Sequence, residues 1–251
     1  MEEAATSARP GRRWLVRAEH VRDAFGLVLL LVLLTYVLTS LLGDRGWKAV
    51  ILCLATSATS IVALTSSHAS PRLVRAAVWI SVLTVLLAVI AAASGAHLWL
   101  NFSSAIQVVL LAVAMAAVLR RVIANAGADS RTILGAISVY TVLGLLFTVL
   151  YTFIARVQSG PFFEGHPQAG GSDFIFFSYT TLTTTGFGNL VPGGQPARML
   201  TGLEMLTGQI FLVTLVAGLV SLWRPGELLK RRREDGIGAK VPQAGEERAN
   251  P

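Results

Sequence analysis

Long apolar segments separated by short polar connections dominate the chain. A helix needs about 20 predominantly apolar residues to cross the hydrocarbon layer of a membrane. The connections are short except for residues 156–198, which therefore need a separate explanation. The pattern predicts an all-α integral membrane protein with six transmembrane helices, at residues 24–43, 49–67, 76–96, 98–119, 132–155 and 199–223.

The long connection contains an apolar segment that is too short to span a membrane. Residues 156–171 are rich in Gly, Pro and polar side chains, which is typical of an exposed loop. Residues 172–183 are apolar, and irregular Gly-rich backbone follows them. Such backbone occurs at membrane depth only where protein buries it or where it lines a water-filled path. We therefore predict a re-entrant helix at 172–183 and a returning loop.

The composition agrees with a membrane protein. Of the 251 residues, 53% are hydrophobic and 14% are charged, whereas a soluble domain has about a quarter charged residues. The single cysteine, Cys53, excludes a disulfide framework within the chain and metal sites that need several cysteines.

The distribution of Lys and Arg predicts the orientation of the spans. Cytoplasmic connections carry the excess of basic residues. With the N-terminus in the cytoplasm, 17 of the 21 basic residues are cytoplasmic, and the other four are Arg45, Lys48, Arg156 and Arg198. Both termini are therefore predicted to be cytoplasmic. This topology explains the net charge of +7 without a nucleic-acid partner. The compact chain favours a bacterial plasma membrane.

Both ends of the chain are polar and basic. In the N-terminal tail, residues 1–23, apolar side chains recur at helical spacing from Trp14 onward. They indicate either an amphipathic helix on the membrane surface or an extension of the first span. The C-terminal tail, residues 225–251, has a basic run that fits an ordinary cytoplasmic anchor or a contact for anionic lipid headgroups. This run consists of Lys230, Arg231, Arg232 and Arg233.

Residues 181–189, TLTTTGFGN, follow the predicted re-entrant helix. A cation that crosses a membrane loses its water shell, which rings of backbone carbonyls from four identical loops can replace. Successive carbonyls point in one direction only if the backbone alternates in hand, and glycine does this without steric cost. Gly186 and Gly188 meet this requirement, and Thr184 can add a ring of hydroxyl oxygens.

Residues 177–192, FSYTTLTTTGFGNLVP, resemble the pore signature of the potassium channel family, whose usual filter is T-V-G-Y-G. The resemblance covers residues 132–223. It implies a pore domain at 132–224, with an outer helix at 132–155, a pore helix at 172–183 and an inner helix at 199–223. The implied filter is Thr184, Thr185, Gly186, Phe187 and Gly188, and potassium would bind backbone oxygens of the first four and the Thr184 hydroxyl.

Three positions depart from the family's usual pattern. Thr185 stands where Val or Ile is usual, Phe187 replaces Tyr, and Asn189 at the outer mouth replaces Asp. These changes alter the packing behind the filter and the charge at its mouth, while the carbonyl ladder is kept. They leave open a weakly selective cation channel on the same fold.

The resemblance also implies a homotetramer, because each chain has one filter segment and the family's pore needs four. Flow would be passive, so we expect no enzymatic step and no cofactor besides the permeant potassium ion. A voltage sensor needs a basic residue at every third position of its moving helix, but residues 98–119 contain none. Residues 24–121 therefore predict a peripheral four-helix bundle without a sensor. A non-conducting accessory or scaffold subunit is the alternative from another class.

The last predicted span holds two further candidate residues. Glu204 is the only acidic residue deep inside an apolar segment, and such carboxylates are costly and usually functional. It is expected to brace or gate the filter, or to bond to a neighbouring subunit. Gly208 falls where the family's inner helix has its gating hinge, but a glycine there can also permit close helix packing.

Overall fold

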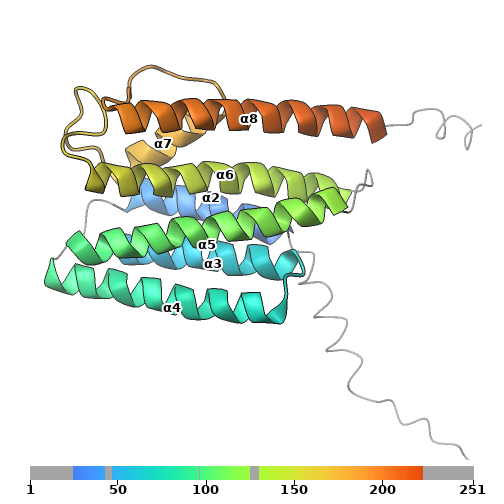
Figure 1. Ribbon diagram of the computed structural model, residues 1–251, viewed down its shortest axis with the longest axis horizontal. Helices are drawn as coiled ribbons and strands as arrows, with labels where there is room; N and C mark the ends of the chain where they lie inside the picture. Colours follow the sequence, from blue (N-terminus) through green and yellow to red (C-terminus); the bar gives the residue numbers. More distant parts are fainter. Residues whose placement is uncertain (1–24, 43–46, 96, 125–129, 223–251) are drawn as a thin grey trace, which may run out of the picture.

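The computed structural model describes residues 25–42, 47–95, 97–124 and 130–222, and within these ranges all regular structure is helical. Both predicted tails, 1–23 and 225–251 with its four basic residues, lie outside the described residues. The seven described helices are α2 (Phe25–Leu41), α3 (Lys48–Ser66), α4 (Pro71–Ser94), α5 (His97–Ala124), α6 (Ser130–Val157), α7 (Gly171–Leu182) and α8 (Gln195–Leu222) (Figure 1).

Five of these helices, α3, α4, α5, α6 and α8, are long and apolar enough to cross a membrane. Helix α2 has 17 residues, so its length is about 25 Å, somewhat less than the hydrocarbon layer of about 30 Å. The all-helical architecture and the apolar helices agree with the sequence-based expectation of a membrane protein. The count of six spans stays a prediction.

The helices differ from the predicted segments mainly at their ends. The third begins at Pro71 instead of residue 76, because the Ser70 side chain accepts a hydrogen bond from the Leu73 N–H at 3.3 Å. Proline suits this first turn, since it has no N–H to leave unpaired. The bounds of the last three helices also differ from the prediction. Helices α6, α7 and α8 correspond to the predicted segments 132–155, 172–183 and 199–223. Hydropathy marks only the apolar part of a helix and misses its polar end turns.

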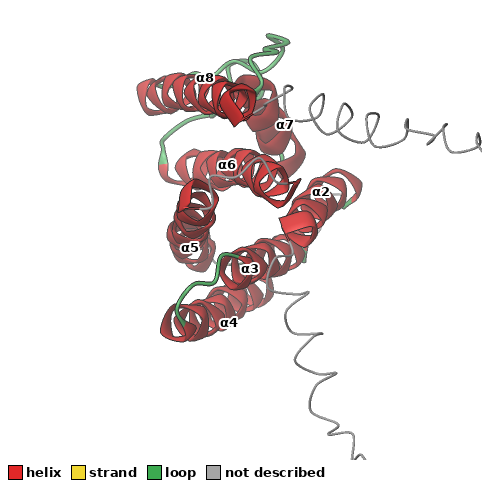
Figure 2. Cartoon of the chain, turned by 90° about the vertical axis from the view of Figure 1, so that its right-hand side faces the viewer, coloured by secondary structure: helices red, strands yellow, loops and turns green. Residues whose placement is uncertain are grey.

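Helix α6 lies at the centre of the molecule. Helices α2, α3, α5 and α6 surround a common interior, and α4 packs outside them against α3 and α5 (Figure 2). On its other side, α6 contacts α7 and α8. Helix α6, which belongs to the predicted pore domain, therefore also packs against helices of the predicted peripheral bundle.

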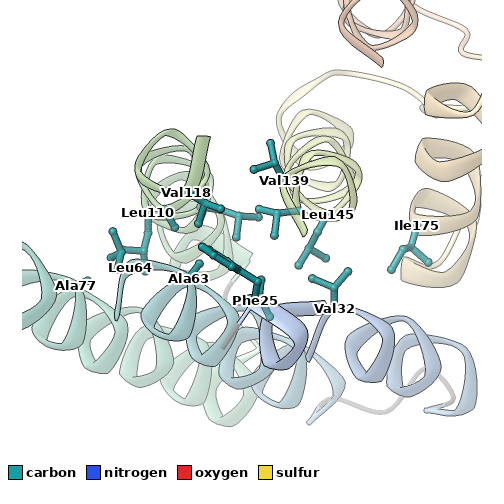
Figure 3. Close-up of a cluster of buried hydrophobic side chains, with 14 residues drawn as sticks. Phe25, Val32, Ala63, Leu64, Ala77, Leu110, Val118, Val139, Leu145 and Ile175 are labelled. Atoms are coloured by element: carbon teal, nitrogen blue, oxygen red, sulfur yellow. The ribbon is translucent and has the colours of Figure 1, made fainter. Parts of the chain in front are cut away.

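Apolar side chains fill one half of this bundle, the half in which α2 begins (Figure 3). Phe25, Val28 and Val32 of α2 contribute, and the Ser138 hydroxyl of α6 donates to the Phe25 carbonyl at 2.9 Å. Inside a membrane, close packing and such interhelical hydrogen bonds hold helices together. We call this set the apolar plug; its other buried members are Ala63, Leu64, Ala77, Leu110, Leu111, Ala114, Val118, Val139, Val142, Leu145 and Ile175.

A second, mainly aromatic cluster fixes α7 against α6. Tyr151 of α6 lies 5.3 Å from Phe177 of α7 and 5.4 Å from Phe162, measured between ring centroids. Phe163 completes the contact with α7 at 5.0 Å from Phe177. Aromatic pairs at these separations stabilise a fold beyond their buried area. The cluster thus sets the position from which the chain leaves α7.

Candidate functional site

Helix α7 ends at Leu182, shortly before the predicted filter segment, residues 184–188. At its start, the Asp173 carboxylate accepts a hydrogen bond from the Gly170 N–H at 2.7 Å, and its charge suits a helix N-terminus. At its end, the N–H groups of Thr185 and Gly186 both donate to the Thr180 carbonyl, at 2.8 and 3.1 Å. The first residues of the segment are therefore tied to the last turn of α7.

The backbone of the segment alternates in hand. Thr184, Gly186 and Gly188 have positive φ values of 57°, 48° and 77°, whereas Thr185 and Phe187 between them do not. This is the alternation that aims successive carbonyls in one direction. The two glycines were predicted from the sequence, but left-handed Thr184 was not, since an L-residue pays about 1–2 kcal/mol for this conformation.

The carbonyl oxygens of this segment accept no hydrogen bond from any residue that the structure describes. All five residues are exposed in the single chain, and apart from the adjacent residues no described residue has an atom within 4 Å of a Cβ built on Gly186 or Gly188. Backbone carbonyls are obligatory acceptors that normally find a partner. These oxygens are therefore available to a ligand outside their own chain.

Contacts within the chain hold two of the three positions that depart from the usual filter. The Thr185 hydroxyl lies 2.9 Å from the Thr183 hydroxyl, which itself donates to the Tyr179 carbonyl at 2.7 Å. The proton between the two hydroxyls therefore comes from Thr185. The ring of Phe187 stacks on Phe176 of α7, with centroids 5.7 Å apart. Asn189, the third departure, is exposed.

Glu204 joins three helices behind the segment. It lies on α8 and is completely buried. One of its carboxyl oxygens accepts from the Tyr151 hydroxyl of α6 at 2.5 Å, and the other lies 2.5 Å from the Ser178 hydroxyl of α7, which is also 2.7 Å from the Gly144 carbonyl oxygen. Sequence reasoning missed these partners, although a buried carboxyl group implies nearby donors. Both oxygens are thus engaged inside the chain, which favours the bracing role over a bond to a neighbouring subunit.

Gly208 lies where α8 crosses the end of α7. A Cβ at this position would lie 2.7 Å from the Leu182 carbonyl oxygen, so no side chain fits without a shift of backbone. The Tyr140 hydroxyl of α6 donates to the same oxygen at 3.0 Å, and the Tyr140 ring stacks on Phe211 of α8. The glycine therefore permits a close helix crossing, and its role as a hinge stays a prediction.

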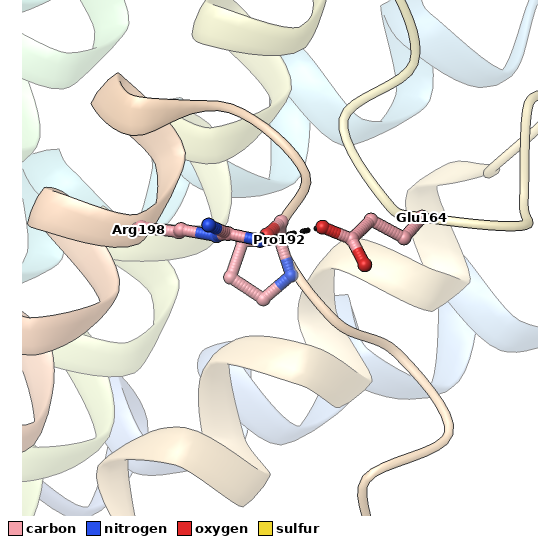
Figure 4. A network of polar contacts seen from close by, with 3 residues as sticks. All are labelled: Glu164, Pro192 and Arg198. Carbon is pink, nitrogen blue, oxygen red and sulfur yellow. Dashed lines mark hydrogen bonds and ion pairs between the residues drawn. The ribbon is translucent and has the colours of Figure 1, made fainter.

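The residues after the segment are tied to the preceding loop (Figure 4). Arg198 of α8 donates to the Glu164 carboxylate at 2.6 Å and to the Pro192 carbonyl at 3.1 Å. Two backbone bonds, Glu164 N–H to Val191 O at 2.8 Å and Gly193 N–H to Phe162 O at 2.9 Å, reinforce the link. The sequence shows both charges of the ion pair but gives no reason to pair residues so far apart.

Comparison with known proteins identifies one related family. Residues 138–224, which hold most of α6, all of α7, the 184–188 segment and α8, match a family model described as ion channel. No curated protein and no solved structure matches the chain. The match supports an ion-channel function for this part of the chain, without specifying the ion.

Proposed function

We propose that this ion-channel region conducts potassium passively, and that four copies of the chain surround one pore. The observation that carries the proposal is the alternating backbone of residues 184–188, whose carbonyl oxygens accept no hydrogen bond from the part of the chain that the structure describes. Rings of such oxygens replace the water shell of a potassium ion in the known carbonyl filters. Thr184, Thr185, Gly186 and Phe187 supply the ligands.

Assembly of four copies fits the exposure of the conducting elements. Only 17% of the apolar window of α8 is buried in the single chain, compared with 56% for α6. The filter itself is also exposed, and Phe187 is 68% accessible. Neighbouring subunits around a central axis cover the remaining surfaces and bring four filters together. The positive-inside pattern supports cytoplasmic termini, and we propose a bacterial plasma membrane as the location.

The electrostatics of α7 favour a cation in this pore. The helix ends at Leu182, immediately before the filter, so the negative end of its dipole lies beside the permeation path. The local contacts of Thr185 and Phe187 restrain the filter from within the chain. Exposed Asn189, which gives the mouth no carboxylate, is the feature that favours the weakly selective alternative.

Potassium flux into liposomes that contain the purified full-length protein tests the proposal. Gly186→Ala forces a Cβ onto a residue with a φ of 48°, which distorts the carbonyl ladder, so we expect selective flux to be lost. Gly202→Ala is the matched control, because no described residue outside its own helical turn has an atom within 4 Å of a Cβ there. We expect this control to conduct like the wild type.

The outcomes separate the competing functions. Unchanged selective flux in Gly186→Ala would rule out the filter assignment. A reversal potential near zero with potassium on one side and sodium on the other would favour a weakly selective channel. Wild-type protein with no flux above that of empty vesicles would favour a non-conducting accessory or scaffold subunit.

A further inference from the structure

The helix bundle holds a cavity that conduction does not use. It has a volume of about 620 Å³ and lies between α2, α3, α5 and α6, with the start of α7 in its wall. It borders the apolar plug at Leu145 and Ile175 and extends away from it to Thr35 and Thr39 in the second half of α2. Pockets for small organic molecules have volumes of about 300–1,000 Å³. The cavity is therefore large enough to bind one.

Two basic side chains line the cavity. Lys48 and Arg156 line it, and its described lining includes no Asp or Glu. The Arg156 guanidinium donates to the Ser104 hydroxyl and to the Leu100 carbonyl, and it forms no ion pair with any described residue. The Lys48 side chain runs beside the start of α7, with its Cε 3.6 Å from a Cβ built on Gly171. This arrangement favours an anionic ligand.

The wall between these charges and the plug accepts hydrogen bonds. Five of its threonine hydroxyls donate their protons to the carbonyl four residues earlier, at 2.6–2.8 Å, so their oxygens act as acceptors toward any further partner. Gln107 also lines the cavity, and its amide nitrogen donates to the Thr56 hydroxyl, which shows that an oxygen of this wall does accept a further hydrogen bond. Such a wall favours hydroxyl donors on the ligand. The five threonines are Thr35, Thr39, Thr56, Thr148 and Thr152.

We propose that this cavity binds a small hydroxylated organic anion. Its carboxylate or phosphate group lies near Lys48 and Arg156, and its hydroxyl groups donate to the threonine wall. The ligand is either dissolved or the headgroup of an anionic lipid, because both present the same chemistry. Gly171 and Phe174 of α7 also line the cavity, so the ligand contacts the helix that precedes the filter. The binding itself does not depend on conduction.

The single cysteine provides a direct test. Cys53 lines the cavity and is the only thiol in the chain. Full-length protein in detergent is treated with sulfonatoethyl or trimethylammonioethyl methanethiosulfonate, which are anionic and cationic. Modification is followed by mass spectrometry, and each rate is divided by that for free β-mercaptoethanol. Because two cations lie at the cavity, we expect the anionic reagent to be favoured roughly tenfold.

Charge variants identify the source of this preference. Lys48→Gln and Arg156→Gln should each reduce it severalfold, whereas Arg198→Gln, which removes a basic residue outside the cavity, should leave it unchanged. Absence of reaction with both reagents would show that the cavity is closed, and preference for the cationic reagent would show that it does not select anions. Either result overturns the proposal.

Protection of Cys53 distinguishes the two sources of ligand. Protection by dissolved glycerol 3-phosphate supports a soluble hydroxylated anion, and protection by phosphatidylglycerol in mixed micelles supports a lipid headgroup. Failure of both to slow the anionic reagent contradicts binding of a hydroxylated anion.

Discussion

Glu204 shows how one residue can hold the parts of a channel together. Its carboxyl group is completely buried, and its two oxygens each contact a hydroxyl group of a different helix. Loss of one partner of a buried hydrogen bond costs more than the bond contributes, because the other partner is left unsatisfied. The residue therefore stabilises the position of α7, and with it the start of the filter.

Glu204→Ala is expected to destabilise the protein by about 2–4 kcal/mol, since it leaves the Tyr151 hydroxyl without its carboxylate acceptor and opens a cavity, whereas Ser178 keeps the Gly144 carbonyl as an acceptor. Glu204→Gln keeps the shape, one acceptor and one donor, so its effect should be clearly smaller. Thermal unfolding of the two variants in detergent measures the difference. Equal stability of Glu204→Ala and the wild type would show that the contacts do not brace α7.

Thr185 offers a second prediction at this scale. Thr185→Val restores the residue type usual in the potassium channel family and removes one hydroxyl, whose partner Thr183 keeps its bond to Tyr179. The stability cost should therefore stay below about 1.5 kcal/mol. We expect potassium selectivity, measured from the reversal potential against sodium, to be maintained or increased. A clear decrease would mean that the bond between Thr183 and Thr185 is itself needed for selectivity.

At the scale of elements, the crossing of α7 and α8 sets the geometry behind the filter. Gly208 lets α8 approach the Leu182 carbonyl, and Tyr140 of α6 donates to the same oxygen. Three helices therefore meet at the residue that ends α7. A change in the angle of α8 at this point moves the first residues of the filter directly.

Gly208→Ala should force these helices apart, at a cost of about 1–3 kcal/mol for overpacking. We expect a lower unfolding temperature and reduced potassium flux. Gly202→Ala on the same helix has free space around its Cβ within the chain and serves as the control. If Gly208 acts only as a hinge, its alanine variant will change the flux and leave the unfolding temperature unchanged.

The elements also show what the sequence can and cannot predict. Hydropathy locates the apolar helices because each is a local signal, and the motif places Gly186 and Gly188 because their spacing is local too. The partners of Glu204 could not be predicted, since Tyr151 and Ser178 reach it only through the packing of three helices. The left-handed Thr184 was missed because its residue type does not reveal this conformation. The shared role of α6 also depends on tertiary contacts.

At the scale of the whole molecule, the proposed pore needs more than one chain. Residues 184–188 are exposed, and only 17% of the apolar window of α8 is buried in the single chain, compared with 56% for α6. We therefore expect native mass spectrometry of the detergent-solubilised protein to give four times the 26.7 kDa mass of the chain. A species that stays monomeric while liposomes still show selective flux would contradict the shared filter.

The apolar plug has an electrical consequence for the assembled channel. Moving an unpaired ion into a medium of low dielectric constant costs on the order of tens of kcal/mol. The cavity brings polar side chains into one half of each bundle, but the plug between Phe25 and Val142 closes the other half with hydrocarbon. The plug therefore acts as an insulator, so that each bundle can hold a polar cavity without becoming a leak parallel to the pore.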